Sequence, residues 1–373
     1  MKIVHLSDTH LGARQMHYTD PRGRNAREQD IYDVFTAAVD KVLELQPDAV
    51  IHAGDLFDGY HPSAAALGVA LDQVARLRDA QIPVVIVAGN HSTPRGAATD
   101  HVFALLERFG GVHAVHASPR LVEIGALAVT AVPHCNDREQ LRQWITEAEP
   151  VASASFNVLV THVGLDGLGH VGSSEAGSVE LSGETLEAVA SFDYIALGHL
   201  HKFDRPRINA VYAGSLERLS WADDARRKGI VEIDLAADPL DDSFITMHAL
   251  EGRKHLRLPE IDASQADNLT DAIAAAAERD DLEGAIVRLP IRDVTVEVFG
   301  AIDRRTINAA FKECLHLELD PHFLDAGSAG ANPAAPQDLR AFLAQRCPAG
   351  VEPAEFISRA EAYMTKAAEE IGA

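Results

Sequence analysis

The sequence predicts a β-sandwich flanked by helices, followed by a small α+β unit and a helical C-terminal tail. Over the first two thirds of the chain, short β-branched runs alternate with longer amphipathic segments, which is the pattern of strands covered by helices. Later apolar runs follow one another without helices between them, and the pattern changes again near Phe244. At 373 residues the chain is long enough for two modest domains and an appendage.

The main unit is expected to contain two kinds of strand. Buried strands are predicted at Lys2–Leu6, Ala49–His52, Val84–Val87, Val158–Thr161 and Tyr194–Leu197. Apolar residues recur at helical spacing over Glu28–Leu45 and Ala64–Leu77, so helices separate the early strands. Further strands without helices between them are predicted at Val112–Val115, Leu121–Ile124, Leu127–Val132, Val211–Ala213 and Ile230–Ile233.

From about Phe244 the order becomes strand, strand, helix, strand, helix, strand. The segments are Phe244–Leu250, Leu256–Leu258, Ala266–Glu278, Ala285–Ile291, Arg304–Phe311 and Cys314–Leu319. The predicted organisation is therefore a main domain at 1–243, a small α+β domain at 244–324, a Gly/Ala/Pro-rich linker at 325–337 and a helical segment at 338–373. The tail carries an apolar stripe through Phe356, Tyr363 and Ile371, which either contacts a partner or folds back on its own domain.

Composition narrows the possible environment and partners. The formal net charge of −23 counts against a nucleic-acid partner, although Arg14, Arg22, Arg24 and Arg27, and Lys202, Arg205 and Arg207, could form a local basic rim. Three widely separated cysteines predict neither a disulfide framework nor a zinc knuckle. The N-terminus reaches Asp8 too early for a signal peptide, and no apolar run is long enough to span a membrane. We expect a cytoplasmic protein.

Polar side chains follow five of the predicted strands. They are Asp8 and His10, Asp55 and Asp58, Asn90 and His91, His162, and His199 with His201. Because ligand sites in open α/β sheets gather at the carboxyl ends of strands, five loops can converge on one point. Carboxylate, imidazole and amide together suit Mn²⁺, Fe²⁺ or Zn²⁺ better than Mg²⁺ or Ca²⁺.

The spacing of these residues predicts a two-metal site. Along an extended backbone, alternate side chains point the same way, so Asp8 can chelate with His10, and His199 with His201. Two metals about 3.5–4 Å apart that share a carboxylate would clamp a phosphate diester and provide a nucleophile near neutral pH. Asp55 is the candidate bridge. Each motif alone is more often a turn than a ligand, but five at strand ends indicate a phosphoesterase.

The motifs Asp-x-His, Gly-Asp-x-x-Asp, Gly-Asn-His, Thr-His and Gly-His-x-His occur in this order. The series resembles the calcineurin-like metallophosphoesterase superfamily. Its details resemble the SbcD/Mre nuclease branch, on the strength of His10-Leu11-Gly12, the run from Ala53 to Asp58 and above all Gly214-Ser-Leu-Glu-Arg218. By this resemblance, the small α+β unit is similar to a DNA-capping domain, and the tail is similar to a segment that grips the coiled-coil base of an ATPase partner.

The resemblance implies roles for the strand-end residues. One metal would be held by Asp8, His10, Asp55 and His201, and the other by Asp55, Asn90, His162 and His199. His91 would lie outside both ligand sets and protonate the leaving sugar oxygen, with Asp58 expected to orient it. Ser92 departs from the family's pattern, in which an acidic residue commonly follows the motif histidine.

The function implied is that of a metal-dependent DNA exonuclease and endonuclease subunit in DNA repair and end processing. Two divalent ions, with Mn²⁺ expected, an SbcC-type coiled-coil ATPase and a second copy of the chain would be its cofactors and partners. Two alternatives stay open. Another phosphatase or phosphodiesterase of the superfamily would share the ligands, and a non-catalytic assembly scaffold would have lost them. All eight expected ligand positions are filled, counting Asp55 once for each metal, so the scaffold ranks last.

Overall fold

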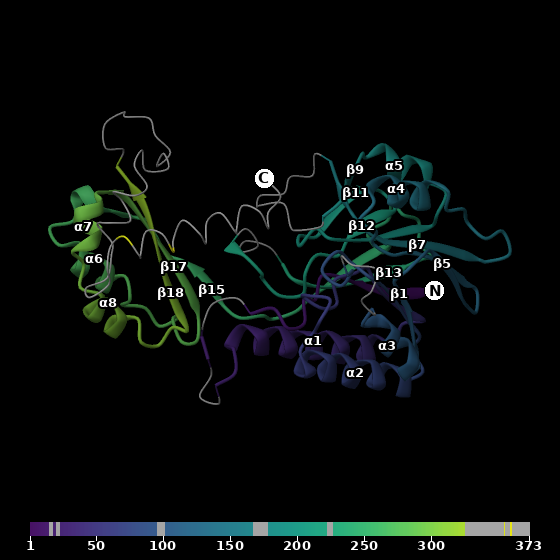
Figure 1. Ribbon diagram of the computed structural model, residues 1–373, viewed down its shortest axis with the longest axis horizontal. Coiled ribbons are helices and arrows are strands. Elements are labelled where there is room, and N and C mark those ends of the chain that lie inside the picture. Colours follow the sequence, from purple (N-terminus) through teal and green to yellow (C-terminus); the bar gives the residue numbers. More distant parts are fainter. Residues whose placement is uncertain are drawn as a thin grey trace.

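The computed structural model describes residues 1–14, 18–19, 23–94, 101–166, 178–221 and 227–324, together with Ala354 and Arg359. The predicted linker at 325–337 and almost all of the predicted tail at 338–373 lie outside these residues. The described residues form a main unit and a small unit, which lie side by side (Figure 1).

Two six-stranded sheets form the main unit. The first has the order β14-β13-β1-β2-β3-β4, with β1 at Lys2–Leu6, β2 at Ala49–His52, β3 at Val84–Val87, β4 at Val112–Val115, β13 at Gly229–Asp234 and β14 at Ile245–Ala249. The second has the order β11-β12-β10-β7-β6-β5, with β5 at Arg120–Ile124, β6 at Leu127–Val132, β7 at Phe156–His162, β10 at Tyr194–Gly198, β11 at Asp204–Arg207 and β12 at Ala210–Tyr212. The strands β1 to β4 are parallel, as are β6, β7, β10 and β12, so their carboxyl ends share an edge in each sheet.

Helices cover the outer faces of both sheets (Figure 1). α1 (Ala26–Leu45), α2 (Ala64–Asp79) and α3 (Phe103–Phe109) pack on the first sheet, while α4 (Arg138–Thr146) and α5 (Glu184–Ala188) pack on the second. A third apolar core lies between the two sheets. The side chains of Asn25 and Ser63 cap α1 and α2 by accepting hydrogen bonds from main-chain N–H groups of the first turn. The main unit is thus a helix-flanked sandwich, as predicted.

Most predicted elements of the main unit agree with the structure to within two residues, and β7 is longer than expected. The helices α3, α4 and α5 were not predicted. They have seven, nine and five residues, too few for an apolar stripe to repeat clearly. A short parallel pair, β8 (Gly164–Leu165) with β9 (Glu180–Leu181), was also missed.

The small unit is a parallel sheet with helices packed against it. β15 (His255–Arg257), β16 (Ile261–Asp262) and β18 (His316–Phe323) all pair in parallel with β17 (Ile286–Val294). A 3₁₀ turn, η2 (Ala263–Gln265), follows β16, and the helices are α6 (Leu269–Ala275), α7 (Val296–Gly300) and α8 (Arg304–Ala310). Their apolar side chains close a separate core around β17.

The strand expected at Phe244–Leu250 does not begin this small unit. As β14 it pairs antiparallel with β13 and forms the edge of the first sheet of the sandwich. Phe244 is buried between the sheets, with its ring 6.2 Å from that of Tyr194. The change from one unit to the other therefore falls after Ala249, because the apolar pattern of β14 is satisfied by the main core.

Buried charges join the two units where the chain passes between them. Arg27, fully buried, lies 2.7 Å from the Asp30 carboxylate and 3.6 Å from that of Glu217. Arg253, on the small-unit side, also pairs with Asp30 and donates to the main-chain oxygen of Gly284 at 2.7 Å. A Cβ atom at Gly252 would lie 2.3 Å from Glu217 Oε2, so a larger residue here would require the Glu217 carboxylate to move. Two cations and two anions compensate one another at this junction.

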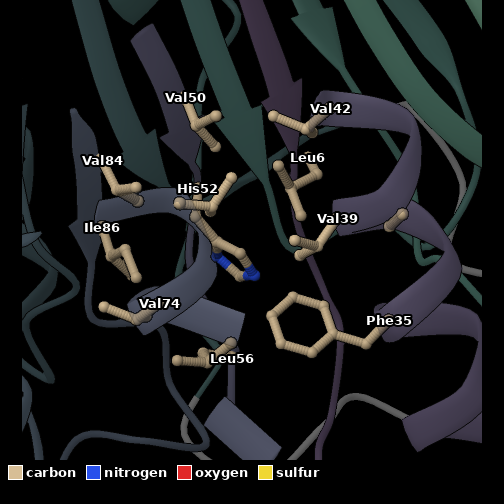
Figure 2. A pocket seen from close by; sticks show the side chains of 12 residues that line it. Leu6, Phe35, Val39, Val42, Val50, His52, Leu56, Val74, Val84 and Ile86 are labelled. Carbon is tan, nitrogen blue, oxygen red and sulfur yellow. The ribbon is translucent and has the colours of Figure 1, made fainter. Parts of the chain in front are cut away.

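The core under α1 and α2 contains a small apolar cavity of about 20 Å³. Figure 2 shows the ring of His52 pointing into it beside Phe35. His52 Nε2 lies 2.9 Å from Thr9 Oγ1, whereas Nδ1 has no hydrogen-bond partner among the described atoms. The cavity has room for about one water molecule, so it is a packing defect and not a ligand site. No helix in the described part of the chain is long and apolar enough to cross a membrane.

Candidate metal centre

The backbone turns sharply at the residues expected to hold metals. Asp8, His10, Asp55 and His199 all have positive φ angles, at 50°, 52°, 50° and 102°. Main-chain hydrogen bonds fix the first two loops against each other, since Asp8 N donates to Gly54 O and His10 N to Asp55 O, both at 3.0 Å. Such conformations cost free energy for residues other than glycine and persist only where the surroundings determine them.

Glycines let these loops approach closely. A Cβ atom at Gly89 would lie 2.2 Å from Asp55 Oδ1, and one at Gly198 would lie 1.9 Å from Ala53 O. A Cβ at Gly54 would lie 2.2 Å from His162 Nδ1. These three positions therefore accept only a residue without a Cβ atom, which lets the backbone approach the site closely.

One group of side chains consists of Asp8, His10 and His201, each of which offers a ligand atom within 4.8 Å of the others. The Nε2 atoms of His10 and His201 are 3.1 Å apart. Two imidazole nitrogens at this distance need a proton or a cation between them, because two lone pairs repel. His10 Nδ1 donates to Asp58 Oδ1 at 3.1 Å, which leaves Nε2 as the atom that faces the group.

A second group consists of Asp8, Asp55 and His162, and all three are fully buried. His162 Nδ1 donates to Ala53 O at 2.8 Å. His162 Nε2 then faces two acceptors, Asn90 Oδ1 at 2.9 Å and Asp55 Oδ2 at 3.1 Å. The close Nε2–Oδ2 approach lacks hydrogen-bond geometry, so Asp55 Oδ2 is a buried carboxylate oxygen with no hydrogen bond among the described residues. His199 lies next to this second group, with its Nδ1 3.2 Å from Asn90 Oδ1.

The electrostatics of the buried carboxylates and imidazoles are strongly coupled. Burial raises the pKa of Asp8, and the neighbouring His162 only partly offsets this. Burial alone would also raise the pKa of Asp55. The positive charge of His162 and its contact with the Asp55 carboxylate outweigh burial, so the pKa of Asp55 lies well below its usual range. Burial lowers the pKa of His162, yet Asp55 and then Asp8 raise it to about 9. Without a metal, a proton on His162 Nε2 compensates the carboxylates.

These observations fit a pair of divalent cations. Asp55 and Asp8 each belong to a group with imidazole nitrogens, and the amide Nδ2 of Asn90 has no partner among the described atoms while its Oδ1 faces two imidazoles. His10 and His162 both donate their Nδ1–H to an oxygen outside the group, the arrangement that orients a metal-ligating histidine. A cation at His162 would replace the Nε2 proton.

The structure brings all nine predicted site residues together, but two details differ from expectation. The backbone at Asp8, His10 and His199 is not extended, so the alternation argument was wrong. His199 contacts Asn90 while His201 contacts His10, and the two histidines therefore do not form a chelating pair. Asp8 and His10 do share a group, because the turn at both residues directs them to it.

His91 lies beside the groups and is contacted by Asp58 in an unexpected way. Its ring meets that of His10 edge to face at 4.7 Å, and its main-chain N–H donates to Asp55 Oδ1 at 3.0 Å. His91 Nδ1 donates to the main-chain oxygen of Asp58 at 2.9 Å, while the Asp58 carboxylate is 3.8 Å away and accepts from His10. Because His91 also lies within 4.8 Å of ligand atoms of His10 and Asp55, this geometry allows either a proton donor or a ligand.

One strand-end residue was missed. His134 follows β6, is 3% exposed and has its ring 6.4 Å from that of His162. The rule that found the other site residues, a polar side chain just after a buried strand, applies to it as well. Burial lowers its pKa to about 4, so the ring is neutral near pH 7. Ser92 is fully buried, with Oγ 3.5 Å from Phe57 O.

The expected basic rim is largely neutralised. Arg27 is buried in the junction between the units, and Arg14 pairs with Glu28 at 2.8 Å. Lys202 pairs with Asp204 at 2.7 Å, and Arg207 pairs with Glu187. Arg22 lies outside the described residues. Sequence clustering of cations overestimated the positive surface, because acidic side chains from other loops fold against them.

Comparison with known proteins agrees with this geometry. A family model described as calcineurin-like phosphoesterase matches residues 1–203. The DNA double-strand break repair protein Mre11 of Methanocaldococcus jannaschii is 30% identical over 301 residues, which are 77% of this chain and 77% of that protein. Mre11 of Thermoplasma acidophilum is 27% identical over 325 residues (83% and 81%), and Mre11 of Sulfurisphaera tokodaii is 29% identical over 234 residues (62% and 56%). The chain belongs to the calcineurin-like phosphoesterase family, and the Mre11 proteins are its homologues.

Proposed function

We propose that this protein is a metal-dependent DNA nuclease that cleaves phosphodiester bonds during DNA repair. The observation that carries the proposal is the pair of ligand groups, Asp8 with His10 and His201 and Asp8 with Asp55 and His162, which share Asp8, on a chain whose relatives are named for DNA double-strand break repair. A phosphomonoesterase of the same family would present similar ligands. The relationship over about three quarters of the chain, including most of the small unit, favours DNA as the substrate.

Two metal ions, with Mn²⁺ as the expected species, would be held by the residues described above. Asp8, His10 and His201 would hold one, Asn90, His162 and His199 the other, and Asp55 would contact both. Four imidazoles and an amide among these ligands favour Mn²⁺ over Mg²⁺. Bound there, divalent ions would stabilise charge on the phosphate oxygens and make water a nucleophile near neutral pH.

His91 is the proposed general acid. A carbonyl oxygen only accepts hydrogen bonds, so the contact with Asp58 O fixes the proton on His91 Nδ1. The other ring nitrogen, Nε2, is then the atom that can carry a proton to the leaving sugar oxygen. The His91 side chain is 25% exposed, whereas the neighbouring His10 and Asp55 are buried, so substrate can reach the His91 ring.

We further propose that the chain acts in the cytoplasm as a dimer with an SbcC-type coiled-coil ATPase. The support is the sequence of the tail beyond residue 337, whose apolar stripe is predicted to be helical and to lie on a partner. A chain ending at Asp325 should lose binding to a co-expressed ATPase but keep metal-dependent cleavage. Full-stoichiometry co-purification of the shortened chain would rule out the tail as the binding segment.

The nuclease proposal is tested with the full chain on four substrates: linear duplex DNA, circular single-stranded DNA, bis-p-nitrophenyl phosphate and p-nitrophenyl phosphate. We expect cleavage of DNA and of the diester with Mn²⁺, and no cleavage in excess EDTA. Asp55→Asn should abolish activity, whereas Asp79→Asn, an exposed carboxylate on α2, should not. Hydrolysis of the monoester alone would indicate a phosphatase, and DNA cleavage that survives EDTA would overturn the metal centre.

A further inference from the structure

A buried lysine stands behind the metal centre. Lys228, the residue before β13, is 4% exposed, although lysine is among the residues least often buried. Its Nζ donates to His201 O at 2.6 Å and to Ser215 Oγ at 2.8 Å. Burying an ammonium group costs free energy unless its hydrogen bonds are made, so the two contacts of Lys228 are what offset the cost of burying its charge.

One acceptor, His201, is a proposed metal ligand, and the other, Ser215, lies in a loop that packs against it. Ser215 lies in the run Gly214-Ser-Leu-Glu-Arg218, which follows β12. Its N–H donates to His201 O at 3.3 Å, and its Oγ donates to Glu217 O at 2.8 Å. A Cβ atom at Gly214 would lie 2.9 Å from Phe203 N, so the run packs directly against residues 201–203. Ser215 Oγ also lies 3.4 Å from His201 O, so three hydrogen bonds to this oxygen are described, and the one from Lys228 is the shortest and is charge-assisted.

We propose that Lys228 is a positioning residue for the metal site formed by Asp8, His10 and His201. It fixes the main chain of His201, and through it the ring whose Nε2 lies 3.1 Å from His10 Nε2. The same run reaches Asp8, because Ser7 Oγ is 3.3 Å from Gly214 O and 2.6 Å from Asp8 Oδ2. This inference rests on the proposed metal centre and assigns a function to the buried ammonium.

The second proposed site, at Asn90, His162 and His199, is anchored by different contacts. His162 is the last residue of β7, and its Nδ1 donates to Ala53 O at the end of β2. Loss of Lys228 should therefore weaken one metal site and spare the other. Outer contacts of this kind change metal affinity by roughly 10–100-fold. A residue that contributed only to general stability would lower both affinities or neither.

The test is a Mn²⁺ titration of the full chain, monitored by electron paramagnetic resonance and by calorimetry. Wild type should bind two ions. Lys228→Met should remain folded in EDTA, as judged by circular dichroism, and should bind one Mn²⁺ at least about tenfold more weakly with the other unchanged. The matched control is Lys254→Met in the small unit, because Lys254 Nζ also donates to a main-chain oxygen, that of Asp281 at 2.7 Å. Its titration should equal that of wild type.

The possible failures are distinct. A wild-type chain that binds no Mn²⁺ overturns the metal centre and this inference with it. If wild type binds two ions and Lys228→Met binds both as tightly, or both equally weakly, only the role of Lys228 is overturned. Should Lys228→Met not fold, Ser215→Ala carries the test, since it removes one acceptor of the ammonium and the link to Glu217. It should weaken one site by several-fold, and an unchanged titration would then refute the inference.

Discussion

The contact between Asp58 and His10 leads to a prediction that separates metal binding from proton transfer. The Asp58 carboxylate accepts from His10 Nδ1 at 3.1 Å, whereas His91 Nδ1 donates to the main-chain oxygen of the same residue. Asp58→Asn removes the negative charge from the first contact and leaves the second in place. The variant should therefore bind metal more weakly and should retain its general acid.

The size of the effect follows from the exposure of the carboxylate. Removing an outer partner of a ligating histidine typically costs about 10–100-fold in metal affinity, or roughly 1.4–2.7 kcal/mol. The Asp58 side chain is 42% exposed, and asparagine still offers an amide oxygen to Nδ1. We expect the lower end, about a tenfold weaker apparent affinity for Mn²⁺. At saturating Mn²⁺ the turnover rate should stay within about threefold of wild type.

The assay is cleavage of a DNA substrate across a Mn²⁺ titration, with the affinity and the plateau rate fitted separately. Asp79→Asn serves as the control for a lost surface carboxylate. A plateau rate reduced by a factor of 10² or more, with unchanged Mn²⁺ affinity, would refute this reasoning. It would mean that the carboxylate acts on His91, as the sequence suggested, despite the 3.8 Å separation between them.

Three further predictions concern other parts of the site. His91→Asn should keep two bound ions and near-normal DNA affinity while turnover falls by roughly 10²–10⁴-fold; loss of one ion per chain by metal analysis would make His91 a ligand. Because the Asp55 carboxylate raises the pKa of His162 from 6.5 to about 9, its ion pair stabilises the metal-free protein fully below pH 6.5, and this stabilisation is lost as pH rises through about 9. Thermal unfolding in EDTA should show that loss of stability. Calorimetry in buffers of different ionisation enthalpy should also show that a proton is released when Mn²⁺ binds at pH 7. Binding without proton release would contradict a protonated His162. Gly198→Ala should lower stability by about 1–3 kcal/mol or more and weaken metal binding, because the added Cβ would lie 1.9 Å from Ala53 O and 2.8 Å from His162 Nδ1. Gly59→Ala is the control, since a Cβ there has no atom within 4 Å, and it should leave both stability and metal binding unchanged.

The sequence was most informative where a buried strand ends in a polar residue. Continuous apolar runs at β1, β2, β3 and β10 marked both the strands and the loops after them, so the side chains that meet at the site could be identified. The conformation of those loops could not. Positive φ angles at Asp8 and His199 depend on hydrogen bonds with Gly54 and contacts with other strands, which a local pattern does not contain.

The same limit explains the remaining differences. β14 was expected in the small unit, because its own residues do not reveal that β13 is its partner. Arg27 was expected at the surface, and only the fold places Asp30 and Glu217 around it. Lys228 carries no motif of its own in the sequence, and its burial depends on loops that are 13 and 27 residues away along the chain.

The left-handed backbone at Asp8, His10 and Asp55 affects how this site can be dissected by mutation. Aspartate, asparagine and histidine tolerate such φ angles better than most residues with a side chain, so the residue types that bind metal are also those that suit the turns. Replacement by alanine would change two quantities together, the ligand atom and the ease with which the backbone holds its turn. Asparagine changes only the ligand. At Asp8 and Asp55, the difference in stability between the Asp→Asn and Asp→Ala variants, measured in EDTA, would report how much the residue type at the turn contributes to the free energy of folding.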